Sequence, residues 1–364
     1  MANQIQAFVL GSDGNLWLET GPFNNLSQTL ATRQQIDANV TNLYSQVGEN
    51  RVWRTGFQAI NAGEIYVLGT DDNLWLEHAP FNSVPPSRVQ VDGSVQTFQA
   101  IDIGTVFVLG NDGNLWLERA PFGTVPPART QIDGSVLAFQ ALDTETVFVL
   151  GTDGNLWLET APFGNVPPFR QQIDANVSQF WAVDQGTVYV LGNDLNLWYE
   201  PGPFGDMNIS LSNRTQIDAN VNDFQPLRVS TDGGSTISGS NADVIFILGH
   251  DSNLWLVQGP YGGVSHTMQT RQFVDGNVIS FGAVDTSNVF VIDGNLNLWY
   301  ETPPYGAQHR QQVDGNTVAC QPLFPPEQLF ARQHHPFARA KKFVGSKMSQ
   351  ASHKTSPTKA KERA

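Results

Sequence analysis

FQALDTETVFVLGTDGNLWLETAPFGNVPPFRQQIDANV, residues 139–177, is one copy of a unit from which most of the chain is built. The triplet Asn-Leu-Trp at its centre recurs along the sequence, beginning at positions 15, 73, 114, 155, 196, 253 and 297. The intervals between these starts are 58, 41, 41, 41, 57 and 44 residues. Seven copies with a period near 41 residues indicate a repeat architecture.

Each unit carries the patterns of four short strands. Within residues 139–177 we expect strands at 139–142, 147–150, 156–159 and 170–173, because these segments are rich in β-branched and aromatic residues or alternate apolar with polar ones. Asp153-Gly154 predicts a tight hairpin turn, since both residues tolerate a positive φ. The three prolines and one glycine of residues 161–168 predict a connecting loop. The 3.6-residue period of a helix is missing from the unit.

Four antiparallel strands in about 41 residues are typical of one β-propeller blade, so the seven units predict an all-β, seven-bladed β-propeller. The N-terminal segment Gln6–Gly11 aligns with the second strand of later blades, which leaves blade one without an innermost strand. Residues 320–323 are similar to 224–227, the first strand of blade six. We therefore expect the N- and C-terminal segments to share blade one and close the ring, which removes exposed sheet edges.

Acidic and basic residues are distributed unevenly along the chain. Residues 1–323, which we expect to form the propeller, hold 11 Arg, no Lys and 32 acidic residues, a net charge of −21. Residues 324–364 hold six Lys and three Arg against two Glu, a net charge of +7, and we expect them to form a basic, disordered tail. Phosphate binding needs a basic surface, so we expect no nucleic-acid partner for the propeller.

The cysteine count, the N-terminal residues and the length of the apolar runs indicate where in or outside the cell the protein is found. The single cysteine, Cys320, excludes an internal disulfide. The N-terminal residues lack the charged and apolar regions of a signal peptide, and no apolar run approaches the length of a membrane span. We expect a soluble protein that is cytoplasmic or is released without a signal peptide.

Three residue types recur at fixed places in the units. An Arg precedes an Asp by four residues in every blade, and in six blades a Glu follows the triplet Trp by two residues, whereas blade six has Val257 there. In blades two to four the Glu and the Arg are 11 residues apart, across the proline-rich loop. One interpretation of the pattern is a cross-strand ion pair that stabilises each blade.

A second interpretation makes these residues a pocket between blades that binds a sugar. The Trp ring offers a flat face to the sugar ring, and the Glu and Arg side chains hydrogen-bond its hydroxyl groups. The candidate ligand-binding residues are then Trp75, Glu77, Arg88, Trp116, Glu118, Arg129, Trp157, Glu159 and Arg170. The sequence leaves both interpretations open.

Departures from the repeat mark three further places. Residues 41–56 insert a segment between blades one and two, residues 205–210 lengthen a loop of blade five, and residues 228–243 interrupt blade six. Alternating strand directions predict that the irregular loops of blades five and six gather on one face, with the 41–56 insertion on the opposite face. Irregular loops on a rigid scaffold are frequent sites of function, although tolerated surface insertions look the same.

The sequence contains little that indicates catalysis. The seven His residues share no spacing typical of a metal site, and the Asp-Gly-Asn turns lack the ligand pattern of a calcium loop. The sequence has no glycine-rich phosphate loop and no nucleophile elbow. An acidic residue that recurs in nearly every blade indicates a structural role for that residue and not a single active site. We expect no catalytic residues, no metal and no cofactor, and favour a binding protein over an enzyme.

The order of motifs in the unit resembles the tectonin-type repeat of β-propeller lectins. The resemblance is carried by residues 131–136, 139–143, 146–150 and 153–157 and extends over all seven blades. The unit departs from that family in having Asp133 where the family often has Pro, and Arg129 near the place of its usual Trp. The resemblance implies a multivalent lectin that recognises glycans or glycoconjugates, which is the leading functional hypothesis.

Two other classes of protein remain as alternatives. A protein-interaction scaffold of the WD-repeat kind shares the propeller architecture and binds a protein partner, although the Trp-Asp dipeptide of that repeat is missing here. The segment Gly151–Trp157 is also similar to the repeats of streptogramin lyase, a metal-dependent seven-bladed enzyme. The His/Glu/His group of that enzyme has no recognisable counterpart in this sequence.

Overall fold

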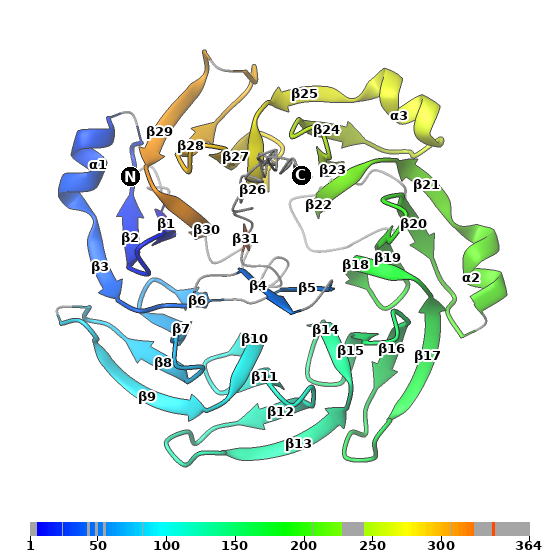
Figure 1. The fold of residues 1–364 in the computed structure, drawn as a ribbon, viewed down its shortest axis with the longest axis horizontal. Coiled ribbons are helices and arrows are strands. Elements are labelled where there is room, and N and C mark those ends of the chain that lie inside the picture. Colours follow the sequence, from blue (N-terminus) through cyan, green and yellow to red (C-terminus); the bar gives the residue numbers. More distant parts are fainter. Residues whose placement is uncertain are drawn as a thin grey trace, which may run out of the picture.

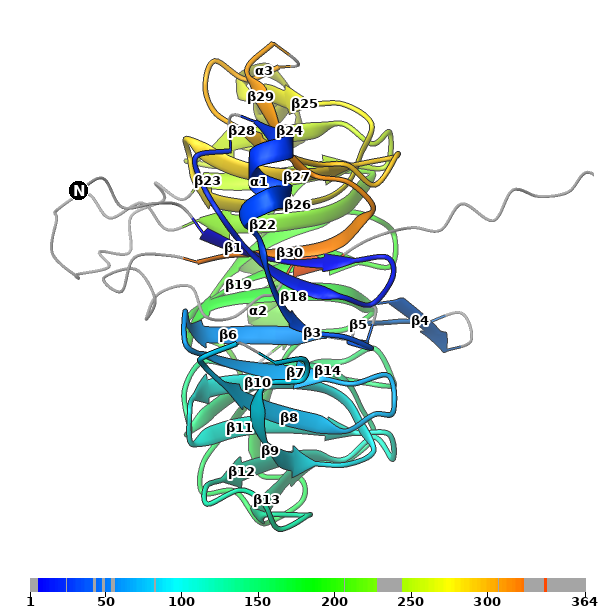
Figure 2. The same cartoon turned by 90° about the vertical axis from the view of Figure 1, so that its left-hand side faces the viewer.

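Seven antiparallel sheets stand around a central axis as the blades of a propeller (Figure 1). The computed structural model describes residues 6–23, 25–41, 44–47, 50–53, 56–81, 83–205, 207–227, 244–306, 308–323 and 337–338. Seen from the side, the ring is a disc (Figure 2). A hairpin of β4 (Tyr44–Val47) and β5 (Asn50–Trp53) projects from one face of that disc. The predicted seven-bladed β-propeller is confirmed.

Blades two to seven are each continuous in sequence, with their four strands in chain order from the axis to the rim. Blade two consists of β6 (Phe57–Asn61), β7 (Glu64–Leu68), β8 (Leu74–His78) and β9 (Ser87–Asp92). Blade three consists of β10 (Val95–Asp102), β11 (Thr105–Gly110), β12 (Leu115–Arg119) and β13 (Ala128–Asp133). Blade four consists of β14 (Val136–Ala141), β15 (Thr146–Gly151), β16 (Leu156–Thr160) and β17 (Phe169–Asp174).

The remaining continuous blades repeat this order. Blade five consists of β18 (Val177–Asp184), β19 (Thr187–Gly192), β20 (Leu197–Pro201) and β21 (Thr215–Asp218). Blade six consists of β22 (Val221–Leu227), β23 (Val244–Gly249), β24 (Leu254–Gln258) and β25 (Gln272–Asp275). Blade seven consists of β26 (Val278–Asp285), β27 (Asn288–Asp293), β28 (Leu298–Glu301) and β29 (Arg310–Asp314).

Blade one is assembled from two distant parts of the chain. Its outer strands are β1 (Gln6–Gly11), β2 (Leu16–Thr20) and β3 (Gln34–Asp37), and β30 (Thr317–Leu323) supplies the innermost strand. β1 and β30 run antiparallel, with Val9 opposite Cys320, so the predicted closure is confirmed. The two-residue strand β31 (Phe337–Ala338) pairs with the other edge of β30. The rest of the expected tail, from residue 324 onward, lies outside the described residues.

A short turn joins the second and third strands in the same way in blades one to six. In blade four, Gly154 has a φ of +78°, and Asp153 accepts hydrogen bonds from the backbone N–H of Asn155 at 3.0 Å and from its side-chain amide at 2.6 Å. Gln172 of β17 then donates to the side-chain oxygen of Asn155 at 3.2 Å. The repeated Asp-x-Asn sequence therefore closes the hairpin and connects it to the outermost strand.

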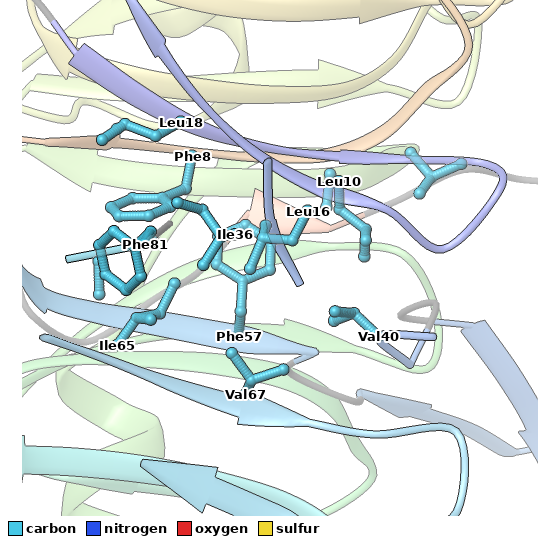
Figure 3. Close-up of a cluster of buried hydrophobic side chains, with 13 residues drawn as sticks. Phe8, Leu10, Leu16, Leu18, Ile36, Val40, Phe57, Ile65, Val67 and Phe81 are labelled. Carbon is cyan, nitrogen blue, oxygen red and sulfur yellow. The ribbon is translucent and has the colours of Figure 1, made fainter. Parts of the chain in front are cut away.

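Hydrophobic side chains fill the spaces between neighbouring blades. Between blades one and two, Phe8 and Leu16 pack against Phe57 and Val67, and all four side chains are fully buried (Figure 3). Successive residues of a strand point to opposite faces, so an inner strand buries one face against the preceding blade and the other against the next. This explains why segments such as Val147–Leu150 are apolar without alternation.

The loop between the third and fourth strands brings an aromatic residue onto the preceding blade. Phe204 of blade five packs edge-to-face on Phe148 of blade four, with ring centroids 6.4 Å apart. Phe23 of blade one packs in the same manner on Phe290 of blade seven, at 5.8 Å. Edge-to-face pairs add about 0.5–1.5 kcal/mol beyond the burial of their area. The loop therefore contributes to the contact between blades.

In three blades this loop contains a short helix, which the sequence did not predict. The helices are α1 (Leu26–Thr32), α2 (Met207–Asn213) and α3 (Val264–Thr270), in blades one, five and six. Seven residues are too few to show a helical period, although Asn25 caps α1 by accepting from Gln28 N–H at 3.3 Å. α2 and α3 lie at the rim (Figure 1), against the outermost strand of the preceding blade. Residues 228–243 lie outside the described part of the chain.

Buried glutamines connect the innermost strands of neighbouring blades. Gln140 of β14 donates to the carbonyl oxygen of Ala182 at 2.8 Å and accepts from the N–H of the same residue at 2.8 Å. Equivalent reciprocal pairs are Gln58 with Ala100, Gln99 with Ala141 and Gln225 with Ala283. Gln321 of β30 accepts from Ala59 N–H at 3.0 Å, which links the C-terminal strand to blade two as well as to β1.

We expect Gln140→Leu to lower the free energy of unfolding by about 1–3 kcal/mol, because the buried N–H and C=O of Ala182 lose these hydrogen bonds. Urea denaturation followed by circular dichroism measures the change. The matched control is Asn165→Ala, at an exposed loop position of the same blade, which we expect to change stability by less than about 0.5 kcal/mol. Equal midpoints for the two variants would show that the glutamine contributes nothing.

Candidate functional site

The Trp and Arg of each unit, and the Glu that six of the seven units carry, lie on the same face of their blade, near the rim. In blade three, β12 carries Trp116 and Glu118, whose side chains share a face because they are two residues apart. β13 places Arg129 opposite Glu118. The equivalent pairs are Glu77 opposite Arg88 in blade two and Glu159 opposite Arg170 in blade four. The cross-strand pairing of Glu with Arg in these blades is therefore confirmed.

The Arg guanidinium group lies over the Trp ring in every blade. The Cζ atom of Arg129 is 4.1 Å from the ring centroid of Trp116. The equivalent pairs are Arg33 with Trp17, Arg88 with Trp75, Arg170 with Trp157, Arg214 with Trp198, Arg271 with Trp255 and Arg310 with Trp299, at 3.9–4.2 Å. Such cation–π stacking contributes about 0.5–1 kcal/mol at a partly exposed site. One face of each Trp ring is thus covered by the chain itself.

The same Arg forms an ion pair with the preceding blade. Nη1 of Arg129 is 3.5 Å from Oδ2 of Asp92, the last residue of β9. The equivalent pairs are Arg33–Asp314 at 2.9 Å, Arg88–Asp37 at 3.5 Å, Arg170–Asp133 at 3.6 Å, Arg214–Asp174 at 3.1 Å, Arg271–Asp218 at 3.4 Å and Arg310–Asp275 at 3.0 Å. These seven ion pairs join every blade to its neighbour, including blade seven to blade one.

The Glu of the cluster is fully buried beside this ion pair. Glu118 is 0 % exposed, and its Oε1 lies 3.9 Å from Nη1 of Arg129. Burial raises the pKa of Glu118 to about 9; the hydrogen bond and the negative charge of Asp92 add to the rise, and the charge of Arg129 opposes it. This direction favours the neutral acid form of Glu118 at pH 7. The charges of Arg129 and Asp92 then balance within the cluster.

The nine candidate ligand-binding residues form three of these clusters, one each in blades two, three and four. The structure adds a member that the sequence interpretation missed, because the Arg pairs with an aspartate of the preceding blade: Asp37, Asp92 and Asp133, respectively. The recurrence of Asp was visible in the sequence. Arg129 and Asp92 are 37 residues apart, however, so their pairing depends on how blades pack. The assignment of the nine residues to ligand binding stays a prediction.

Only a small part of each cluster is open to an external ligand. The carboxyl group of Glu118 is enclosed, and the guanidinium group of Arg129 covers one face of the Trp116 ring. The Arg129 side chain is 31% exposed, but its charge is paired with Asp92. The exposed edge can donate a hydrogen bond to a hydroxyl or carboxylate group at the rim. It presents no general acid and no nucleophile to a substrate.

The described residues offer few other kinds of site. A hollow of about 210 Å³ lies beside α1 on blade one, lined by the uncharged residues Thr20, Gly21, Pro22, Gln28, Thr29 and Thr32. Within the described ranges, no three side chains of His, Cys, Asp or Glu are grouped so that they could hold a metal ion. The helices of that same part of the chain are too short to cross a membrane.

The strand order and register define the class of this protein as a seven-bladed β-propeller closed through blade one. Neither a protein-family model nor a curated protein matches the sequence. Among solved structures, the WD40 beta propeller domain of Doa1 is similar to this chain, with a TM-score of 0.47 and 11% sequence identity. The match covers 76% of this chain and 87% of that one. A similarity at this level says nothing about function.

Proposed function

We propose that this chain is a scaffold β-propeller that binds a protein partner through a basic segment of that partner. The observation that carries the proposal is the excess of acidic over basic residues that remains once the ion pairs between blades are formed. Seven of the 11 arginines of residues 1–323 are engaged in ion pairs between blades. Leaving aside the seven paired aspartates and the six buried glutamates, 19 of the 32 acidic residues remain, against four arginines and no lysine.

Six of the remaining acids form a repeated pattern on one face of the disc. Each turn between the second and third strands of blades one to six presents an exposed aspartate: Asp13, Asp71, Asp112, Asp153, Asp194 and Asp251. These turns pack beside the connections between blades, as in the hydrogen bond from Thr70 N–H to the Asn39 carbonyl oxygen at 2.8 Å. The β4–β5 hairpin is also a connection between blades and projects on this side (Figure 2). An acidic face attracts and orients a basic partner.

The test of this proposal measures binding of the full chain to an array of basic peptides at two salt concentrations. We expect the affinity for these peptides to fall at least tenfold as the salt concentration rises from about 50 to about 500 mM, because this rise shortens the Debye length about threefold. The triple variant Asp71→Asn, Asp112→Asn and Asp153→Asn is expected to bind more weakly. Asn keeps the side-chain oxygen that accepts from the turn N–H but replaces the second carboxylate oxygen, which accepts from an Asn side-chain amide. The circular dichroism spectrum of the variant is therefore compared with that of the wild type, to check that the turns are kept.

A matched control lies on the opposite face. Asp102, Asp143 and Asp184 also accept from a backbone N–H two residues on, at 2.7–2.9 Å, in the loops between the first and second strands. The triple Asp→Asn variant at these positions removes the same charge. We expect it to keep most of the binding. Equal loss in both triple variants would refute the assignment to the turn face, and no binding to any basic peptide would refute the scaffold proposal.

The lectin hypothesis remains a second candidate, supported by the resemblance to tectonin-type repeats and by one observation. Trp75, Trp116 and Trp157 are partly exposed beside arginines whose side chains are 29–33% exposed, in the same geometry in successive blades. Repeated rim sites of this kind suit multivalent binding. A glycan array separates the candidates. A lectin has several equivalent sites and binds glycans in the presence of a chelator, whereas a lyase of the streptogramin type would need a metal.

A further inference from the structure

Six buried glutamic acids occupy positions in which an ionised carboxylate has no hydrogen-bond donor. Glu19, Glu77, Glu118, Glu159, Glu200 and Glu301 are 0–1% exposed, and neither oxygen of any of them forms a hydrogen bond. In four of the six, an arginine Nη1 atom lies 3.6–3.9 Å from one of these oxygens, beyond ordinary hydrogen-bond length. A buried carboxylate without donors is costly, because the lost hydration is not replaced. An acid in this position can instead donate its own proton.

The acceptor for that proton is the aspartate of the preceding blade. Each Glu lies close enough to this Asp for the Asp carboxylate to raise the pKa of the Glu, and in blade three Nη1 of Arg129 is 3.5 Å from Oδ2 of Asp92 and 3.9 Å from Oε1 of Glu118. Two carboxyl groups therefore meet one arginine, Arg129 in blade three. The charge of Glu118 also acts on Tyr66 of β7, whose hydroxyl donates to the carbonyl oxygen of Ile103 at 2.9 Å. One positive charge balances only one carboxylate, so the second carboxyl group is neutral when it holds a proton.

We propose that each of these six clusters binds one proton between the Glu of one blade and the Asp of the preceding blade, and that loss of this proton in alkali weakens the contact between blades. The proton lies in the hydrogen bond from the Glu hydroxyl to an Asp oxygen. On deprotonation it leaves to solvent as water, after transfer to hydroxide. Two carboxylates then share a single guanidinium group and repel one another.

The direction of the pH dependence follows from the ionisation of these groups. Burial raises the pKa of Glu118 to about 9, and burial likewise raises the pKa of each of the other five glutamates to about 9. In the unfolded chain the pKa of Glu is near its ordinary value, about 4.3. The folded protein therefore holds more protons than the unfolded chain between these two values. The stabilisation that these protons contribute is complete below about pH 4, falls as the pH rises through that window, and is gone once the pH passes about 9.

Blade six provides a natural comparison. Val257 occupies the place of the Glu there and is 1% exposed, while Arg271 and Asp218 still form their ion pair at 3.4 Å. The contact between blades thus forms with an uncharged side chain in this position. A side chain that cannot ionise should fit the other blades as well, which makes Glu→Gln a suitable substitution.

Infrared spectroscopy of the folded full chain tests the proposal directly. At pH 7 we expect the C=O stretching band of protonated carboxylic acids, and we expect it to disappear with a midpoint near pH 9. The triple variant Glu77→Gln, Glu118→Gln and Glu159→Gln should lose about half of the band, since three of six groups remain. An absent band in the wild-type protein at pH 7 would overturn the proposal, whatever the variant does.

Proton release on unfolding gives a second, independent measurement. At pH 7 the triple variant is expected to release three fewer protons on unfolding than the wild type, measured by calorimetry in buffers of different ionisation enthalpy. Its melting temperature should also fall less between pH 7 and pH 10. The control Glu145→Gln removes an exposed carboxylate and should change neither quantity. The same release and the same alkaline loss in the triple variant and the wild type would contradict proton sharing between blades.

Discussion

A chain that ends at Gly315 is expected not to fold, since it lacks the innermost strand of blade one. Without β30, the whole β1–β30 ladder is lost, as is the hydrogen bond from Ala59 N–H to Gln321. Fully buried side chains such as Phe8 and Val9 would then face water. Each blade supports its neighbours by packing, so a gap at one place opens the whole ring. Circular dichroism and size-exclusion chromatography of the truncated chain measure the outcome.

The matched comparison is a chain that ends at Leu323. It keeps β30 and loses residues 324–364, including the two-residue pairing of β31. We expect this chain to remain folded with a melting temperature close to that of the full chain, which also tests the predicted boundary between propeller and tail. A folded, monomeric protein from the chain that ends at Gly315 would disprove the role of β30 in closure.

Arg129→Ala is expected to lower the free energy of unfolding by about 2–4 kcal/mol. The substitution leaves Asp92, which is 5% exposed, without its ion-pair partner, and it removes the stacking on Trp116. Arg129 itself is 31% exposed, so solvent screens part of the interaction, and the value is lower than that for a fully buried pair. Denaturant unfolding curves of the purified variant measure this loss.

Three further variants separate the causes. Arg119→Ala removes an exposed arginine of the same blade and should change stability by less than about 0.5 kcal/mol. Arg129→Lys keeps a charge but not the planar group that stacks on the ring, and an intermediate loss is expected. Adding Asp92→Asn to Arg129→Ala should recover part of the loss, because no unpaired charge remains. Should Arg119→Ala and Arg129→Ala cost the same, the ion pair between blades would have no measurable role.

The fold could be predicted because its determinants are local. Alternation within Leu156–Glu159 and the turn at Asp153-Gly154 depend on neighbouring residues alone, and a period near 41 residues multiplies that local signal seven times. The similarity of residues 320–323 to residues 224–227 could also be seen in the sequence, so closure through blade one could be expected. The three rim helices could not be predicted from the sequence, because α1, α2 and α3 are only seven residues long and replace a loop in some blades only.

The candidate site was predictable in its members but not in its chemistry. Spacing alone indicated that Glu118 and Arg129 are cross-strand neighbours, and the register confirms this pairing. The covering of Trp116 by Arg129, the partner Asp92 on another blade, and the raised pKa of Glu118 were not evident from the sequence. As a result, the Trp, Glu and Arg side chains that suit sugar binding are largely occupied by contacts with one another and with Asp92.

The sequence by itself therefore determined the number of blades, the strands within each blade and the place where the ring closes. These follow from backbone preferences and side-chain periodicity over a few residues. Only the tertiary structure decided which charges meet across blades and which carboxyl groups are buried deeply enough for their pKa to rise. Pairing of Arg129 with Asp92 needs two sheets to pack at a fixed distance, and the pKa of Glu118 depends on how completely that packing excludes water.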